Sequence, residues 1–185
     1  MIDETIATAE KHMKGAVAVL QRELDSIRTG RAHPGLVEAL KVDIYETTLP
    51  LNQVATVAVP EARLIAITPF DRQALGAIEK AIQKSDLGLN PTNDGHTVRL
   101  AIPQLTEVRR KEMAKQVHHK VEEGHVAVRN VRRHAIDQLR GLDKGKEISD
   151  DEEKRAQDQL QKMTDRYIEE INKLGKTKEA ELLEV

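Results

Sequence analysis

The chain has 185 residues, of which 39% are hydrophobic, 32% charged and only 2% aromatic, and its formal net charge is −2. The absence of cysteine excludes disulfides, thiol nucleophiles, iron–sulfur clusters and thiolate zinc sites, and the scarcity of aromatic rings disfavours a protein that binds nucleic acid by stacking on its bases. Because charges of both signs are abundant and nearly cancel, long solvated helices are favoured over disorder.

The positions of the prolines predict two parts. All six lie between residues 34 and 103, and a proline inside a helix costs about 3 kcal/mol. Both flanks can therefore form long helices, whereas the middle of the chain cannot. We expect an α+β protein in which residues 1–30 and 106–185 form a long three-helix bundle and residues 31–105 form an inserted small β/α/β domain.

The first predicted helix covers residues 3–28. Its apolar residues recur at spacings of four and three from Met13 to Ile27, which is the pattern of a helix that packs along one seam. Thr29 and Gly30 follow as a stop signal.

The insert has the alternation and turn chemistry of a small β-rich domain. Apolar and polar residues alternate at 40–44 and again at 98–102, as in half-buried strands. Runs rich in β-branched residues at 54–59 and 64–67 predict two more strands. Asp71 can cap a short helix that turns Leu75, Ile78 and Ile82 inward, and residues 85–95 are rich in turn formers.

Two further helices are predicted after Pro103. Residues 106–141 carry an apolar face on which Gly124 would allow a close backbone approach. The glycines of residues 141–146 predict a loop. Ser149 and Glu152 then form a capping box for a third helix, whose inward residues are Ala156, Leu160, Met163, Tyr167, Ile171, Leu174 and Leu182.

The chain crosses between the two predicted domains twice, near residues 30–35 and 102–104. Two crossings restrict separation of the domains but permit rotation, so we predict a two-strand hinge. Its residues are Gly30, Arg31, Ala32, His33, Pro34, Gly35, Pro103, Gln104 and Leu105.

The second and third long helices have opposite charges. Residues 107–146 contain 11 Lys and Arg against 6 Asp and Glu, whereas residues 147–185 contain 7 against 12. On a helical wheel five cations of the second helix fall within about 40° of one another, with Glu122 the one acid among them and Arg132 between this stripe and the apolar face. The stripe consists of Lys111, Lys115, Arg129, Arg133 and Arg140.

Two interpretations of this stripe remain open. It can be a footprint for the phosphates of RNA, or it can pair with the acidic neighbouring helix in a structural or chaperone-like adaptor. RNA is preferred to DNA because no helix-turn-helix, zinc finger or basic zipper is visible.

Catalytic and metal-binding patterns are weak. No phosphate-cradling glycine loop or serine elbow is present, and no set of histidines and carboxylates reproduces a metal-binding helix signature. An enzyme site in the small domain would have to use Asp71, Arg72 or His96. We therefore predict no enzyme, no cofactor and no metal.

The sequence also predicts where in the cell the protein is found. No run of about 18 apolar residues exists, so no membrane span or membrane partner is expected. The acidic start, MIDE, lacks the cationic and then apolar pattern of a signal peptide. These features predict a soluble cytoplasmic protein.

Several blocks of sequence resemble the bacterial ribosome recycling factor family. They cover essentially the whole chain in order, and several are long enough to make chance agreement negligible. The blocks are RTGRAHP at 28–34, PLNQVA at 50–55, IEKAI at 78–82, SDLGLNP at 85–91, PQLTEVRRK at 103–111, VAVRNVRR at 126–133, QKMT at 161–164 and KEAE at 178–181.

The resemblance implies an L-shaped monomer with a hinge between the bundle and the small domain. It implies binding to the ribosome after termination, and splitting of the ribosome into subunits with elongation factor G and GTP hydrolysis by that partner, which releases mRNA and deacylated tRNA. The factor itself is not an enzyme in this family.

The resemblance also implies residue roles. Arg129, Arg132 and Arg133 match arginines that contact large-subunit ribosomal RNA, and Arg28 and Arg31 match a basic motif beside the hinge. Three positions depart from the family pattern: Glu46 replaces the usual glycine, Val108 an acid and His125 a cation. A turn at Glu46 is expected to be affected, because glycine tolerates positive φ.

Overall fold

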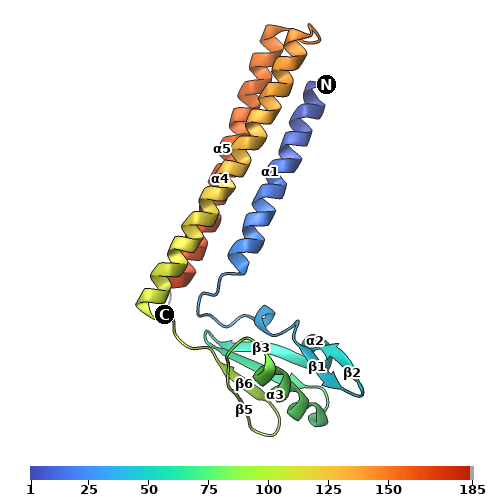
Figure 1. The fold of residues 1–185 in the computed structure, drawn as a ribbon, viewed down its shortest axis with the longest axis vertical. Coiled ribbons are helices and arrows are strands. Elements are labelled where there is room, and N and C mark those ends of the chain that lie inside the picture. The colour runs from blue at the N-terminus through green and yellow to red at the C-terminus, as the bar shows by residue number, and fades with distance from the viewer. Residues whose placement is uncertain (184–185) are drawn as a thin grey trace. The chain divides into compact units, whose positions relative to one another are not determined.

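The computed structural model describes residues 1–183 and divides into two compact units (Figure 1). The first unit contains Met1–Thr29 together with the residues from Glu107 onward, and the second is Gly30–Thr106. These divisions differ by one residue from the boundaries expected from the sequence. The α+β class, with a long helical bundle and a small sheet domain inserted into it, is as predicted.

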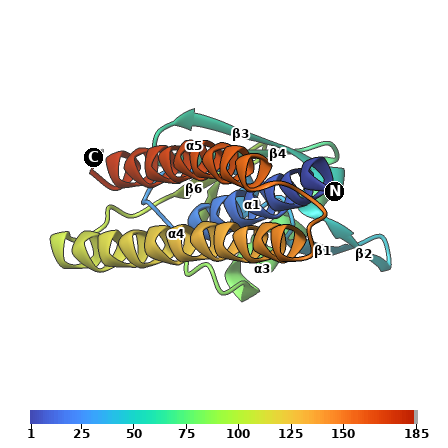
Figure 2. The same cartoon turned by 90° about the horizontal axis from the view of Figure 1, so that it is seen from above.

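Three long helices form the first unit, namely α1 (Ile2–Asp25), α4 (Glu107–Lys144) and α5 (Asp150–Leu183). Figure 2 shows them running alongside one another. Their apolar seams meet in a core built almost entirely from aliphatic side chains and methionine. Among its most deeply buried members are Met13, Leu20, Leu24, Val117, Val128, Leu139, Leu160 and Ile171.

The ends of the helices follow the predicted signals with two differences. Helix α1 ends at Asp25, three residues before the predicted end at residue 28 and ahead of the expected stop at Thr29 and Gly30, because the Ser26 hydroxyl turns back to donate to the Glu23 carbonyl. Ser149 and Glu152 form the expected capping box, in which the Ser149 amide donates to Glu152 Oε2 at 2.8 Å and the Glu152 amide donates to Ser149 Oγ at 3.2 Å. Helix α4, however, runs through Gly141 to Lys144. Leu142 continues the apolar face and is partly buried there, so the helix outlasts the glycine that was expected to end it.

The backbones of the helices come close where Gly124 faces the core, as predicted. A Cβ built on Gly124 would lie 3.3 Å from Leu20 Cδ2 on α1 and 3.4 Å from Ile171 Cδ1 on α5. One residue without a side chain thus lets all three helices approach at the same level of the bundle.

The second unit is a small sheet domain. A four-stranded antiparallel sheet has the order β3-β4-β6-β5, and a separate hairpin pairs β1 with β2. The strands are β1 (Lys41–Ile44), β2 (Thr47–Pro50), β3 (Ala55–Glu61), β4 (Leu64–Pro69), β5 (Pro91–Asn93) and β6 (Val98–Ala101). The helical segments are η1 (Pro34–Leu36), α2 (Leu51–Val54), η2 (Arg72–Ala74) and α3 (Leu75–Lys84).

Helix α3 packs against this sheet and closes a second hydrophobic core. Ile78 and Ile82 from α3 and Ile65 and Ile67 from β4 are all almost fully buried in it. The sequence did not predict β2 or β5. Both are short and largely exposed, so they carry no alternating pattern, and Pro91 is tolerated because β5 is an edge strand.

The β1–β2 hairpin turns at Tyr45 and Glu46. Ile44 pairs with Thr47, so these two residues form the whole loop, and their φ angles are 54° and 61°. Two-residue hairpin loops favour positive φ at both positions. Glu46 therefore adopts the left-handed conformation expected of a glycine, and Tyr45 is held from outside the turn, because its hydroxyl donates to Asp71 Oδ2.

Candidate nucleic-acid interface

The basic stripe lies on the solvent side of α4. No proline interrupts this helix, so residues that share one face of the helical wheel stay aligned along all 38 residues. All five stripe residues are exposed, whereas Arg132 is partly buried at the edge of the apolar face. The stripe residues are Lys111, Lys115, Arg129, Arg133 and Arg140.

Three arginines near the middle of α4 have no counter-ion among the described residues. Within residues 1–183, Arg129, Arg132 and Arg133 form no ion pair or side-chain hydrogen bond with another residue. Lys111 and Arg140 pair only within α4, with Glu107 at 3.4 Å and Asp137 at 3.8 Å. Such exposed pairs contribute little energy, so the stripe is available to an external anion.

Polar contacts between the helices use other residues. Arg166 on α5 donates to Glu10 on α1 at 2.7 Å, and Lys120 on α4 lies 3.8 Å from Glu23 on α1. The stripe is absent from these contacts. Within residues 1–183, direct ion pairs between α4 and α5 therefore do not involve these five cations.

Arg28 and Lys115 come together at one end of the bundle. They line the same cleft of about 540 Å³, which lies between the end of α1 and the first part of α4. Ile27 and Met113 contribute apolar surface to it. Sequence reasoning assigned Arg28 and Lys115 to separate motifs, and it counted Ile27 and Met113 only as core.

Arg31 and the predicted hinge residues belong to the second unit. The Ala32 amide donates to the Ala62 carbonyl and the Ile102 amide to the Arg63 carbonyl, both at 2.8 Å. Ala62 and Arg63 form the turn between β3 and β4, so both linkers are anchored at one turn of the small domain. Gly30, at the start of the first linker, has a φ of 75°, a left-handed conformation that glycine adopts without strain.

The Gly30 linker also packs closely on the other linker. A Cβ on Gly30 would lie 3.1 Å from Leu105 Cγ. Further along, the Gly35 amide donates to His33 Nδ1 at 2.9 Å and so caps the short η1 turn. The predicted hinge residues are thus more ordered than a flexible tether.

His125 is directed into the bundle rather than along the stripe. Its side chain is only 12% exposed, and its Nδ1 lies 3.3 Å from Glu122 Oε1. Its Nε2 lies 2.7 Å from Asn172 Oδ1 on α5. The histidine that replaces the family's cation therefore bridges α4 and α5 and adds no side chain to the stripe.

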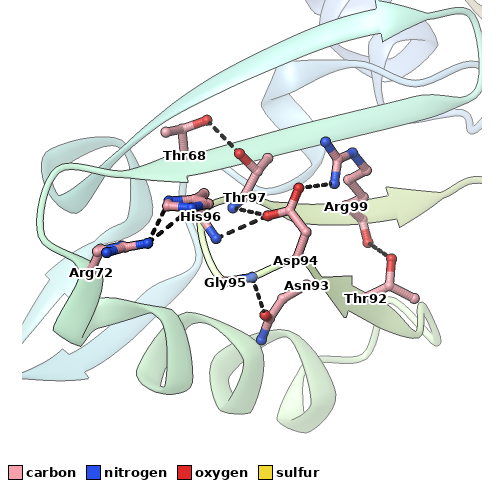
Figure 3. A network of polar contacts seen from close by, with 9 residues as sticks. All are labelled: Thr68, Arg72, Thr92, Asn93, Asp94, Gly95, His96, Thr97 and Arg99. Atoms are coloured by element: carbon pink, nitrogen blue, oxygen red, sulfur yellow. Dashed lines mark hydrogen bonds and ion pairs between the residues drawn. The ribbon is translucent and has the colours of Figure 1, made fainter.

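The polar residues of the small domain build its turns (Figure 3). Asp94 accepts hydrogen bonds from the amides of His96 and Thr97, both at 2.9 Å, and from Arg99 Nη1 at 2.6 Å. The Arg99 bond, followed by the two amides, lowers the pKa of Asp94 far below its usual range. This carboxylate organises the loop between β5 and β6.

The candidates for an enzyme site are used in similar ways. Asp71 caps η2 by accepting from the Gln73 amide at 3.0 Å. Its bond with Tyr45 is the main cause of the lowered pKa of Asp71. Arg72 Nη2 lies 2.9 Å from each ring nitrogen of His96, as Figure 3 shows.

The described part of the chain offers neither a metal site nor a membrane span. Across residues 1–183, no three His, Asp or Glu side chains are grouped so that they could hold a metal ion. No helix in that part of the chain is both long and apolar enough to cross a membrane.

Comparison with known proteins identifies the family. A family profile described as ribosome recycling factor matches residues 20–183. The ribosome-recycling factor of Roseiflexus castenholzii is 54% identical over 185 residues, with complete coverage of both chains.

Solved structures agree over the whole chain. The solution structure of a ribosome recycling factor matches with a TM-score of 0.77 and 44% identity, covering 100% of this chain and 98% of that one. A second match has a TM-score of 0.66, 46% identity and full coverage of both chains. It comes from models of the T. thermophilus ribosome recycling factor and E. coli elongation factor G bound to the E. coli post-termination complex. The present chain belongs to the ribosome recycling factor family.

Proposed function

We propose that this member of the ribosome recycling factor family binds the ribosome after termination and splits it into subunits together with elongation factor G. GTP hydrolysis by that partner drives the step, which releases mRNA and deacylated tRNA for a new round of translation. The T. thermophilus relative is described with elongation factor G on a post-termination complex. The observation in this chain that carries the proposal is that Arg129, Arg132 and Arg133 of α4 have no ion-pair partner within residues 1–183.

The bundle is the part that we propose binds large-subunit ribosomal RNA. Arginines without an internal partner can donate several charge-assisted hydrogen bonds to phosphate oxygens. Arg129, Arg132 and Arg133 form the centre of the contact. Along α4 we propose that the contact also includes Lys111, Lys115 and Arg140. Arg28, which follows α1, and Arg31, which lies in the first linker, are assigned to the same contact.

The small domain is the arm that the partner moves. A proline-free helix of 38 residues spans about 57 Å, so a bundle of such helices can act as a rigid lever. The two linkers, residues 30–35 and 103–105, are proposed as the hinge. They join the small domain at adjacent residues of one turn, an arrangement that suits rotation about a single point.

The factor itself is proposed to carry no catalytic site and no cofactor. Its described polar clusters are accounted for by turns and caps, and the energy of splitting comes from the GTPase partner. A monomer in the cytoplasm, where translation takes place, is the form that we propose acts.

Two measurements on the same preparation test this function. The chain should co-sediment with large ribosomal subunits, and light scattering should show splitting of post-termination ribosomes only when elongation factor G and GTP are both added. Replacing GTP by GDP is the control. Co-sedimentation without any splitting under these conditions would instead support a ribosome-bound structural adaptor.

A further inference from the structure

The cleft between α1 and α4 has an uneven distribution of charge. Five of its lining residues are basic or histidine, but three of these already have carboxylate partners. Lys120 lies 3.3 Å from Glu123, His119 lies 2.9 Å from Glu123, and Arg109 lies 2.9 Å from Glu112. Glu23 also lines the cleft and lies 3.8 Å from Lys120. Arg28 and Lys115 have no ion pair within residues 1–183, so these two cations of the cleft are available to a ligand.

The same cleft is also lined by apolar side chains, Ile27 and Met113. The chain leaves α1 at Ser26, and the Ile27 amide closes a final turn by donating to the Leu24 carbonyl at 3.0 Å. Ile27 and Arg28, which follow this turn, line the cleft together with Met113 of α4. Ser26 and Gln116 add uncharged hydrogen-bonding groups.

A ligand for this cleft needs an anionic part and a flat apolar part with polar edges. An RNA nucleotide outside a base stack has this chemistry: its phosphate suits Arg28 and Lys115, and its base suits Ile27 and Met113 with the Gln116 amide at its edge. A volume of about 540 Å³ is ample for one nucleotide. The bases of double-stranded RNA are stacked inside the helix, so their faces cannot reach Ile27 and Met113.

We propose that the cleft lined by Arg28, Lys115, Ile27 and Met113 binds a single unpaired nucleotide of RNA. The inference rests on the proposed function, and it adds a second, structure-selective contact to the phosphate contacts of the Arg129–Arg133 segment. The cleft thereby distinguishes a bulge or loop from a continuous helix, which a stripe of cations alone cannot do.

The experiment uses the full chain and two RNA probes. One is a short duplex with a single bulged 2-aminopurine, and the other is the same duplex with 2-aminopurine base-paired. The fluorescence of 2-aminopurine is quenched by stacking and recovers when the base leaves the stack. Because no aromatic residue lines the cleft, entry of the bulged base should brighten it.

We expect the parent chain to bind the bulged probe about tenfold more tightly than the paired probe and to brighten only the bulged one. Ile27→Ser should abolish both the preference and the brightening but keep the affinity for the paired duplex. Arg28→Gln and Lys115→Gln should each weaken binding of the bulged probe about tenfold, the scale of a charged hydrogen bond. Lys14→Gln, on an exposed part of α1 outside the cleft, is the matched control.

Equal affinity of the parent for the two probes would overturn the proposal, and so would brightening that survives in Ile27→Ser and Arg28→Gln. Displacement of the bulged probe by poly-glutamate at equal charge would assign the cleft to an acidic peptide instead. Co-sedimentation of the parent with large subunits distinguishes failure of the cleft proposal from failure of the proposed function. If the parent sediments but does not discriminate between the probes, the cleft proposal fails while the proposed function stands.

Discussion

Gly175 on α5 lies directly against Val121 on α4, so closely that a Cβ at position 175 would come within 2.7 Å of Val121 Cγ2. This contact fixes the separation of the two longest helices. The sequence shows Gly175 as one residue of an otherwise ordinary helical run. Nothing in its immediate neighbours indicates that a partner helix needs the space.

Gly175→Ala should therefore destabilise the bundle even though alanine is the better helix former. The methyl group must push Val121 or separate the helices, and overpacking of this kind typically costs about 1–3 kcal/mol. Urea unfolding followed by circular dichroism measures the change. Gly15→Ala on α1 is the control, since a Cβ there meets no atom within 4 Å, and it should stabilise the protein by about 0.5–1 kcal/mol.

Arg129→Ala and Arg132→Ala should each weaken binding to large ribosomal subunits about tenfold or more, because one charge-assisted hydrogen bond is worth about 1.5–3 kcal/mol. Affinity should also fall as salt rises, and less steeply in the variants, since fewer counterions are released. Sedimentation at several salt concentrations measures both effects. Arg155→Ala, which removes an exposed arginine of α5, should bind like the parent. Parental binding by both α4 variants would mean that these arginines are merely solvated.

Removal of the small domain should separate binding from splitting. A chain in which residues 1–29 are joined to residues 107–185 by a short Gly/Ser linker retains all three apolar seams and Arg129, Arg132 and Arg133. It should show high helicity and bind large subunits, but it should fail to split ribosomes with elongation factor G and GTP. Splitting at the full-length rate would exclude the small domain as the lever arm.

The capping box of α5 should make stability depend on pH. The Ser149 amide and hydroxyl hold the pKa of Glu152 below its ordinary value of 4.5. A carboxyl whose pKa is lowered by folding stabilises the protein while ionised, and this contribution is lost as the pH falls through the folded pKa. Glu152→Gln should therefore reduce stability at pH 7, and the difference from the parent should shrink below about pH 4. A constant difference over this range in urea unfolding would contradict the assignment.

The purified chain should hydrolyse neither GTP nor ATP. Asp71 and Asp94 are engaged in a cap and a turn, His96 contacts Arg72, and the sequence contains no phosphate-cradling loop. The test is phosphate release measured across successive purification steps. A rate that stays proportional to the amount of this chain through every step would refute the prediction.

The parts of the fold that follow a periodic pattern could be predicted from the sequence. The seam from Met13 to Ile27, the capping box at Ser149 and the close approach at Gly124 all depend on local spacing, and local spacing is visible in one dimension. The short strands β2 and β5 could not be predicted, because edge strands of three or four residues are specified by their partners rather than by their own alternation.

The candidate site, too, could be predicted only in part from the sequence. The alignment of Arg129 and Arg133 follows from helical geometry alone, so the wheel revealed it. Their lack of counter-ions depends on how the acidic α5 is rotated, which only the packed bundle determines. The meeting of Arg28 with Lys115 depends on the register of α1 against α4, since these residues are far apart in the chain.

The bundle is assembled from segments on either side of the inserted domain, and this has a consequence for how the protein is made. Helix α1 ends at Asp25, but its first partner, α4, is complete only at Lys144 and its second, α5, only at Leu183. At about 5–20 residues per second, roughly 6 to 24 seconds of synthesis separate Asp25 from Lys144, and roughly 8 to 32 seconds separate it from Leu183. The small domain is complete well before that, so it can fold first on the nascent chain. Until α4 has been made, the apolar seam of α1 has no partner helix and stays exposed on the nascent chain.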